Sequence, residues 1–222
     1  MGKPRRNLRS DGSATRARIL ESAGALFGSQ GLASTTSKAI AAQAEVDLAS
    51  INYHFGSRDG LYRAVLVEAH RRFIRIEELE RIATSDIAPE EKLGALLDTI
   101  VGRISGEAHW GMTVLARELA APSSHMSVLR DVEVPPKLHV VLRILSEITG
   151  IPPSAPELFR CLISVAAPCA MLLIAGENLP APGRDVLQVD QRALTDHLHR
   201  FAIAGLHATG KDYRSRSGGS GG

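Results

Sequence analysis

The stretch that decides the fold is residues 35–55, which reads TTSKAIAAQAEVDLASINYHF and predicts two short helices joined by a tight turn. Thr36 is a favourable N-cap, because its hydroxyl oxygen can accept a hydrogen bond from a free amide of the first turn. Small, helix-favouring residues follow over 38–44. Asp47 caps the second helix, in which apolar residues recur at helical spacing: Leu48, Ile51 and Phe55. Small residues let two helices cross closely, as a helix-turn-helix requires.

The second of these helices is expected to present a polar face to solvent. Once Ile51 and Phe55 turn toward the core, the residues left outside are Ala49, Ser50, Asn52, Tyr53 and His54. Base edges in the major groove offer donors, acceptors and a thymine methyl, which such a face can read. The alternative is a small helical hairpin with a solvated side, since this geometry also occurs in proteins that do not bind DNA.

The motifs around the hairpin, in order and spacing, resemble the N-terminal domain of TetR-family transcriptional regulators. The matching pieces are Phe27-Gly28-Ser29-Gln30-Gly31, Thr35-Thr36, Ile40-Ala41, Tyr53-His54-Phe55 and Ser57-Arg58-Asp59-Gly60-Leu61-Tyr62, and the match covers about residues 13–65. Glu45 departs from the pattern, because the family usually has Gly in this turn. A left-handed backbone there would cost Glu on the order of 1 kcal/mol relative to Gly.

The resemblance implies a set of DNA contacts on the hairpin. The residues that would contact phosphates are Thr36, Ser37, Lys38, His54 and Arg58. Those that would approach base edges are Ser50, Asn52 and Tyr53, with Leu48 and Ala49 against thymine methyl groups. The Asn52 amide suits adenine, whose N6 and N7 atoms offer a matching donor and acceptor.

Composition favours an all-α protein. The chain has 222 residues, of which 44% are hydrophobic and only 4% aromatic, and no run of β-branched residues alternates with period two. No stretch shows the length of uninterrupted apolar residues that crosses a bilayer, and the basic N-terminus has no apolar segment behind it. We therefore expect a cytoplasmic protein without a membrane partner.

The net charge of +2 hides an asymmetry along the chain. Residues 1–72 contain 11 Lys or Arg and 6 Asp or Glu, whereas residues 73–222 contain 15 and 18. The basic excess lies on the part expected to meet phosphate, as an electrostatic footprint requires. An imbalance of this size can also arise by chance.

An enzyme is the main alternative class, but three motifs that would support it are absent, so we expect neither catalysis, cofactor nor metal. The sequence lacks a glycine-rich phosphate loop after a strand, a His-Glu-x-x-His pair and a Gly-x-Ser-x-Gly elbow. Cys161 and Cys169 lie about 12 Å apart if they share a helix, too far for a disulfide. They are read as buried small side chains or as a redox pair. A helical interaction module without DNA binding is a further alternative.

Four segments are expected. Residues 1–12 form a disordered basic arm, which is either a solvated tail or a minor-groove contact. Residues 13–62 form a three-helix helix-turn-helix domain, whose first helix ends at Gly31. Residues 63–210 form a helical ligand-binding and dimerisation domain. Residues 211–222 form a flexible tail or a vector-derived remnant.

Apolar spacing predicts the helices of the second domain. One long helix runs from Ser57 past Ile76, and later ones cover 89–106, 108–120, a segment from Ser123 or Ser124 that Pro135-Pro136 interrupts, 138–150, 156–175 with a kink at Pro168, and one from Asp190. The run Arg117-Glu118 … Pro122-Ser123 … Pro135-Pro136 resembles a TetR subgroup whose C-terminal domain carries an Arg-Glu…Pro-Ser…Pro signature.

The two late helices, 156–177 and 190–208, have more apolar surface than one small bundle covers. Paired with their copies across a twofold axis they would form a four-helix interface, although they can also be the core of a monomer. One short reading helix contacts few base pairs, so useful specificity requires two half-sites. We therefore expect a homodimer.

The resemblance implies a small-molecule inducer bound in an apolar pocket, which weakens DNA affinity. Its expected lining is Leu97, Ile100, Trp110, Val114, Leu142 and Met171. Arg117 or Glu118 would contact a polar ligand group, or would serve in surface ion pairing or helix capping. Trp110 can equally be plain core. Together the resemblance implies a ligand-responsive regulator, a repressor that binds a palindromic operator as a dimer.

Overall fold

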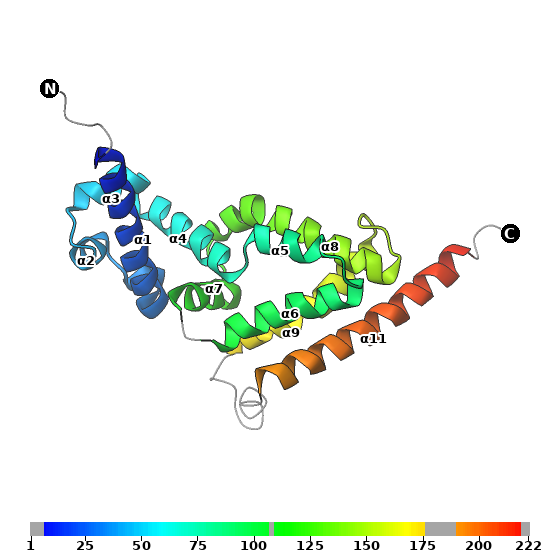
Figure 1. Ribbon diagram of the computed structural model, residues 1–222. Helices are drawn as coiled ribbons and strands as arrows, with labels where there is room; N and C mark the ends of the chain where they lie inside the picture. Colours follow the sequence, from blue (N-terminus) through cyan, green and yellow to red (C-terminus); the bar gives the residue numbers. More distant parts are fainter. Residues whose placement is uncertain (1–6, 107–108, 176–189, 219–222) are drawn as a thin grey trace. The chain divides into compact units, whose positions relative to one another are not determined.

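The computed structural model describes residues 7–106, 109–175 and 190–218, and over those residues it contains helices and no strand (Figure 1). This confirms the all-α prediction. The α-helices are α1 (Asn7–Ser34), α2 (Ser37–Gln43), α3 (Leu48–Phe55), α4 (Arg58–Phe73), α5 (Ile76–Ala83), α6 (Pro89–Ser105), α7 (Trp110–Ala120), α8 (Val134–Thr149), α9 (Pro156–Ala175) and α11 (Gln191–Gly218). A 3-10 turn, η1 (Ser124–Met126), and a π-helical turn, η2 (Leu129–Glu133), precede α8.

The helices pack as two units. The head unit comprises α1–α4 as far as Arg72, together with α7 and η1. The body unit comprises α5, α6, α8, α9 and α11. The sequence predicts a boundary at residues 62/63, with α7 in the second domain. Most of α4 and the whole of α7 instead pack with the head.

Helix α1 is longer than expected. It begins at Asn7, so the expected disorder over residues 1–12 is wrong for 7–12, while residues 1–6 lie outside the described part. A single glycine such as Gly12 costs a helix only about 1 kcal/mol, too little to stop it. The helical path is interrupted at Gly31, whose φ is 81°, and the Thr35 hydroxyl donates to the Gly31 carbonyl over 2.8 Å.

The hairpin of α2 and α3 has the caps that the sequence predicts. The Thr36 hydroxyl oxygen accepts from the backbone N–H of Ala39 over 3.1 Å, and Asp47 accepts from the backbone N–H of Ser50 over 2.7 Å. The turn between the helices has a left-handed residue, Glu45, with a φ of 52°. Glu45 therefore adopts the left-handed conformation that costs a residue with a Cβ atom more free energy than it costs glycine.

The core of the head unit is built from the faces that apolar spacing predicts. Phe27 meets Tyr62 edge to face, with ring centroids 4.8 Å apart. The fully buried large residues around this pair are Ile19, Ile40, Ile51, Leu61 and Leu66. They come from all four helices α1–α4.

Helix α7 packs closely against α1 at two glycines of α1, Gly24 and Gly28. A Cβ atom at Gly24 would lie 2.4 Å from the Trp110 ring, and one at Gly28 would lie 3.3 Å from the Trp110 carbonyl oxygen. Arg117 donates to the carbonyls of Gly28 and Ser29 over 2.9 and 3.1 Å. Glycine at these two α1 positions is what permits so close an approach.

A buried carboxylate joins α7 to α4. The Tyr62 hydroxyl donates to Glu118 over 2.6 Å, and Ser123 donates to the same carboxylate from its backbone N–H and its hydroxyl, both over 3.0 Å. Only 3% of Glu118 is exposed. Burial and the hydrogen bond to Glu118 raise the pKa of Tyr62 well above its usual range, so its hydroxyl stays protonated and donates.

The predicted long helix from Ser57 is broken after Phe73. Arg103 of α6 donates to the Phe73 carbonyl and pairs with Glu78 of α5, so one guanidinium binds both sides of the break. Apolar spacing could not show this, because the residue responsible lies 30 positions away in the chain.

The body unit has one apolar core to which each of its helices contributes, including Leu93, Leu97, Ile144, Leu145 and Leu158. Pro135 and Pro136 stand in the first turn of α8, where they start this helix and do not interrupt an earlier one, because proline fits the first helical turn. Pro168 lies inside α9. Cys161 and Cys169 are both buried and free, as one of the two readings expected.

Helix α11 continues to Gly218, so the expected flexible tail is wrong for residues 211–218; residues 219–222 lie outside the described part. Tyr213 packs against the body core, and Arg214 donates to the Thr149 carbonyl over 2.7 Å. A Cβ atom at Gly210 would lie 2.3 Å from that carbonyl oxygen. These contacts with the end of α8 hold a segment whose composition alone suggests a linker.

Replacing the left-handed turn residue should stabilise the protein. We expect Glu45→Gly to raise the free energy of unfolding by about 1 kcal/mol, because glycine adopts this backbone conformation without a Cβ clash. Urea denaturation followed by circular dichroism measures it. Glu45→Ala is the control, since alanine meets the same clash; a glycine variant no more stable than the alanine variant would contradict the interpretation.

Removing the donor to the buried carboxylate should destabilise the head unit. We expect Tyr62→Phe to lower the free energy of unfolding by about 1–3 kcal/mol, because Glu118 loses a hydrogen bond and stays buried. The same denaturation experiment applies. Tyr53→Phe, at an exposed tyrosine, should change stability by less than about 0.5 kcal/mol; equal effects of the two changes would be the contrary result.

Candidate nucleic-acid interface

Helix α3 has one buried face and one open face. Ile51 has no exposed surface and Phe55 is half-buried, as the spacing predicts. The exposed side chains are Leu48, Ala49, Asn52 and Tyr53. Tyr53 is 84% exposed, unusual for so large an aromatic side chain unless it has a partner. The Asn52 amide beside it supplies a donor and an acceptor, which is the pair that an adenine edge requires.

The N-terminal end of α3 is fixed by Asp47. Besides the backbone bond, the Ser50 hydroxyl donates to Asp47 over 2.6 Å. These hydrogen bonds from the Ser50 side chain and backbone lower the pKa of Asp47, which keeps it ionised. The Ser50 oxygen still has lone pairs, so it can accept from a base amino group while its proton remains with Asp47.

The start of α2 carries three of the residues expected at phosphates. Lys38 is exposed and Ser37 is half-buried. The Thr36 oxygen serves as the N-cap, so its hydroxyl proton is the part left for a phosphate oxygen. A flexible ammonium and two hydroxyl groups on one helical turn suit the backbone of a duplex, which offers only acceptors.

His54 and Arg58 have protein contacts that the sequence did not reveal. His54 is half-buried, with its ring centroid 5.0 Å from that of Tyr53 and 6.3 Å from that of Phe55. Arg58 donates through Nε to the Thr35 carbonyl over 2.9 Å and through Nη2 to the Leu32 carbonyl. Arg58 thus joins the start of α4 to the connection between α1 and α2, and a phosphate contact by its remaining N–H groups stays a prediction.

All ten predicted DNA contacts lie on α2, on α3 or at the helix ends beside them, in one packed unit. Their chemistry is hydroxyl, amide, phenol, imidazole and cationic nitrogen, with Asp47 already engaged at its cap. The arrangement can donate to phosphate oxygens and both donate to and accept from base edges. In the described residues, no group of three His, Cys, Asp or Glu side chains could hold a metal ion.

The seven residues expected to line a ligand pocket fall in two units. Leu97, Ile100 and Leu142 lie in or against the body core, and Met171 on α9 is 58% exposed. Trp110, Val114 and Arg117 belong to the head unit. The Trp110 Nε1–H donates to Glu21 of α1 over 2.7 Å, and the Arg72 guanidinium lies 4.8 Å from the Trp110 ring. Trp110 and Arg117 thus bind α7 to α1 within the head unit, and a ligand contact by either residue stays a prediction.

Gly24 and Gly28 are packing positions that apolar spacing does not reveal, because the absence of their side chains lets α7 approach α1. The available signal was the pair of glycines four residues apart on one helix, a pattern typical of close helix packing. Glu118, expected at a ligand, in an ion pair or at a helix cap, accepts hydrogen bonds from Tyr62 and Ser123 inside the head unit. Only the fold places Tyr62 beside it.

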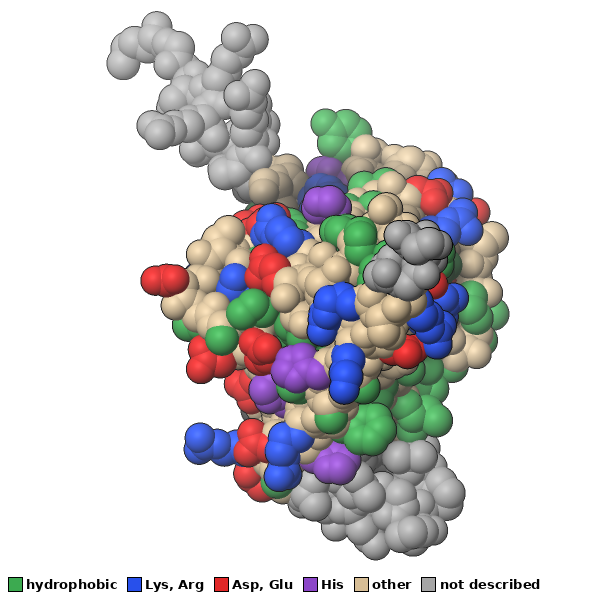
Figure 2. All heavy atoms as spheres, turned by 90° about the vertical axis from the view of Figure 1, so that its right-hand side faces the viewer, with side chains coloured by type: hydrophobic (Ala, Val, Ile, Leu, Met, Phe, Trp, Pro, Cys, Tyr) green, Lys and Arg blue, Asp and Glu red, His purple; other side chains and the backbone are tan. Residues whose placement is uncertain are grey.

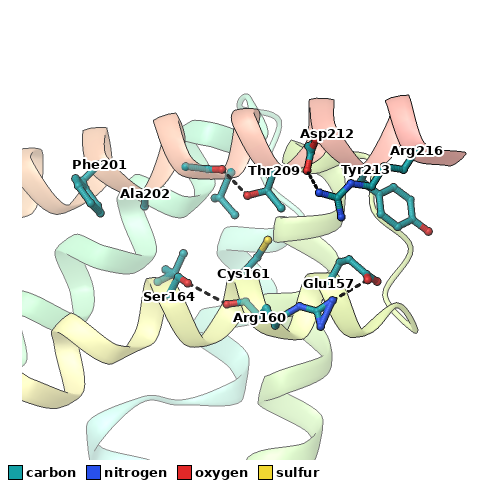
Figure 3. Close-up of a pocket in the computed structure, with 13 residues that line it drawn as sticks. Glu157, Arg160, Cys161, Ser164, Phe201, Ala202, Thr209, Asp212, Tyr213 and Arg216 are labelled. Carbon is teal, nitrogen blue, oxygen red and sulfur yellow. Dashed lines mark hydrogen bonds and ion pairs between the residues drawn. The ribbon is translucent and has the colours of Figure 1, made fainter. Parts of the chain in front are cut away.

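The body unit has a groove between α9 and α11, with a volume of about 670 Å³ (Figure 3). Arg160 pairs with Glu157 along α9 over 2.7 Å, and Arg216 pairs with Asp212 along α11 over 2.7 Å. Cys161 also borders the groove, and burial raises the pKa of its thiol. None of the residues expected in a ligand pocket lines this groove.

Comparisons with known proteins agree with this architecture. The model of the bacterial regulatory proteins of the tetR family matches residues 19–65. The model of the C-terminal domain of the HTH-type transcriptional dual regulator CecR matches residues 89–206, which is more than half of the chain and includes the Arg117-Glu118 run. A search of curated proteins found no match.

Several solved structures share this fold. One is a TetR-like transcriptional regulator from Rhodococcus sp. RHA1, at 21% identity and a TM-score of 0.64, covering 86% of this chain and 95% of that one. Another is FadR from Bacillus subtilis in complex with stearoyl-CoA, at 17% identity and 0.67, covering 85% and 98%. A third is SmeT in complex with triclosan, at 21% identity and 0.65, covering 86% and 91%. With its capped helix-turn-helix and these matches, the chain belongs to the TetR family of bacterial transcriptional regulators.

Proposed function

We propose that the chain is a dimeric repressor, which binds a palindromic operator through α3 and is released from it by a small-molecule effector. The observation that carries the proposal is the open face of α3, where Asn52 and Tyr53 are exposed beside a helix end that Asp47 fixes. A cytoplasmic location follows from this role. The test is selection of bound duplexes from a random pool, followed by a screen for compounds that release them.

Two substitutions separate base reading from backbone binding. We expect Asn52→Ala to reduce discrimination at one base pair of each half-site by about 1–3 kcal/mol, because the adenine edge loses its paired donor and acceptor. Lys38→Ala should weaken all duplexes alike and reduce the dependence on salt, because it removes a charge from phosphate. Fluorescence anisotropy with the selected duplex and its single-base variants measures both. Uniform weakening by both changes would contradict base reading by Asn52.

The dimer is supported by apolar surface on the body unit. Helix α9 has a mean hydropathy of 2.1, yet only 17% of its most apolar window is buried. By length and composition this described helix could cross a membrane, which the sequence analysis did not expect. The large apolar side chains left exposed on α9 and α11 are Phe159, Ile163, Met171, Ile174 and Phe201. Hydrophobic side chains gather beside charged ones on the face in Figure 2.

A second copy of the chain suits this surface. An eight-residue reading helix contacts few base pairs, so operator recognition requires two heads. A twofold interface is self-complementary, so the groove between α9 and α11 would receive apolar side chains from the same two helices of the partner. Phe201 borders the groove and is 75% exposed, so we expect it to make one of these contacts with the partner (Figure 3).

Charges placed on this surface should dissociate the dimer. We expect Phe201→Glu, and separately Ile163→Glu, to raise the dissociation constant at least about 100-fold, because burying an unpaired carboxylate costs several kcal/mol. Sedimentation equilibrium at micromolar concentration measures it. Ile87→Glu is the control, at a residue 43% exposed between α5 and α6. A monomeric wild-type protein would refute the dimer, and wild-type protein that partitions into vesicles would support the membrane alternative for α9.

The effector is proposed by comparison. FadR from Bacillus subtilis holds stearoyl-CoA and SmeT holds triclosan in structures that share this fold. We infer that the body unit of this chain binds an apolar compound near Leu97, Ile100 and Leu142. Ligand and operator would then affect one another reciprocally, since a compound that weakens DNA binding must bind less tightly to the DNA complex.

A further inference from the structure

Arg16 lies against α3 from outside the helix-turn-helix. The central carbon of its guanidinium group is 4.9 Å from the centroid of the Phe55 ring. Phe55 is the last residue of α3 and is half-buried, whereas Arg16 is exposed. A guanidinium stacked on a ring keeps its five N–H donors in its own plane. The stack therefore positions Arg16 without using its donors.

Three other arginines of the head unit use their donors within the protein. Arg58 donates to two backbone carbonyls, Arg117 donates to two more, and Arg72 pairs with Glu21 and Glu68. Within the described part of the chain, no carboxylate or carbonyl pairs with Arg16. Its charge and its hydrogen-bond donors are therefore available to a partner outside this chain.

The position of Arg16 matters because of the polarity of α3. The C-terminal end of a helix carries a partial negative charge, about half an elementary charge, which repels phosphate. Here the end is formed by Phe55 and Gly56, whose N–H returns to the Asn52 carbonyl over 2.9 Å. A cation held over Phe55 offsets this repulsion at the point where a duplex backbone would pass.

We propose that Arg16 binds a phosphate of the operator backbone beside the C-terminal end of α3. The inference rests on the proposed DNA-binding function, because the backbone runs past this end only when α3 lies in the major groove. A guanidinium pairs with two phosphate oxygens at once, which fixes geometry as well as supplying charge. Arg16 thus sets the register in which α3 presents Asn52 to the bases, and it carries no base preference itself.

The chain offers a matched control on the same helix. Arg18 is also exposed and carries the same charge. Its side chain leaves α1 about 200° around the helix from that of Arg16, because successive residues are about 100° apart. A second variant, Arg16→Met, keeps an unbranched side chain over Phe55 but removes the charge, so it separates packing from phosphate binding.

The experiment is a titration of the selected operator and of an unrelated duplex, at salt concentrations from about 50 to 200 mM. We expect Arg16→Ala and Arg16→Met to weaken both duplexes and to reduce the slope of log affinity against log salt by about 0.9 for each protomer. For a dimer this makes the loss of affinity across that range about 12-fold smaller than for wild type. Arg18→Ala should keep the wild-type slope, and thermal unfolding by circular dichroism shows that each variant folds.

The results that would contradict the phosphate contact differ from those that would contradict DNA binding itself. A wild-type slope in Arg16→Ala, or an equal reduction in Arg18→Ala, would overturn the phosphate contact, while selective binding by the wild-type protein would still support the regulator. A wild-type slope in Arg16→Met alone would show that packing on Phe55 is the only role. If the wild-type protein bound neither duplex at low salt, the DNA-binding proposal would fail and this inference with it.

Discussion

The burial of Ile51 is the constraint on which the reading surface depends. Successive residues of a helix are about 100° apart, so a residue with no exposed surface at 51 turns its two successors away from the core. Asn52 and Tyr53 are exposed for this reason, and Phe55, four residues on from Ile51, returns to the protein. Packing of Ile51 against the core of the head unit thus fixes which face of α3 is exposed. The polar residues on the exposed face do not contribute to this packing, so their identity can suit a binding partner.

Local features of the fold could be predicted from the sequence, whereas those made by distant residues could not. The caps of Thr36 and Asp47 and the left-handed Glu45 are decided within three or four residues. The break after Phe73 is held by Arg103, from another helix. In the same way the ten residues predicted to contact DNA could be assigned to their helices, but the carbonyl contacts of Arg58 and the stack of Arg16 required the packed structure.

Helix α7 shows that sequence families and packing units need not share a boundary. The family model of the C-terminal domain covers 89–206 and so includes α7, yet α7 packs with α1 and α4 in the head unit. Its Arg117 and Glu118 bond to residues of those two helices. The Arg-Glu pair that resembles a ligand-domain signature therefore bonds to α1 and α4, the helices that pack with the hairpin in the head unit.

Arg72 lies at the end of α4 where the chain leaves the head unit. It ends the head portion of α4, pairs with Glu21 of α1, and places Nη1 2.7 Å from Nε2 of His109. His109 in turn caps α7 by accepting from the Gly111 N–H over 3.0 Å. Arg72 therefore links α1 to the segment that precedes α7, both within the head unit. Helix α1 also carries Arg16. The same helix therefore packs with the hairpin and supplies a residue at the edge of the proposed DNA surface.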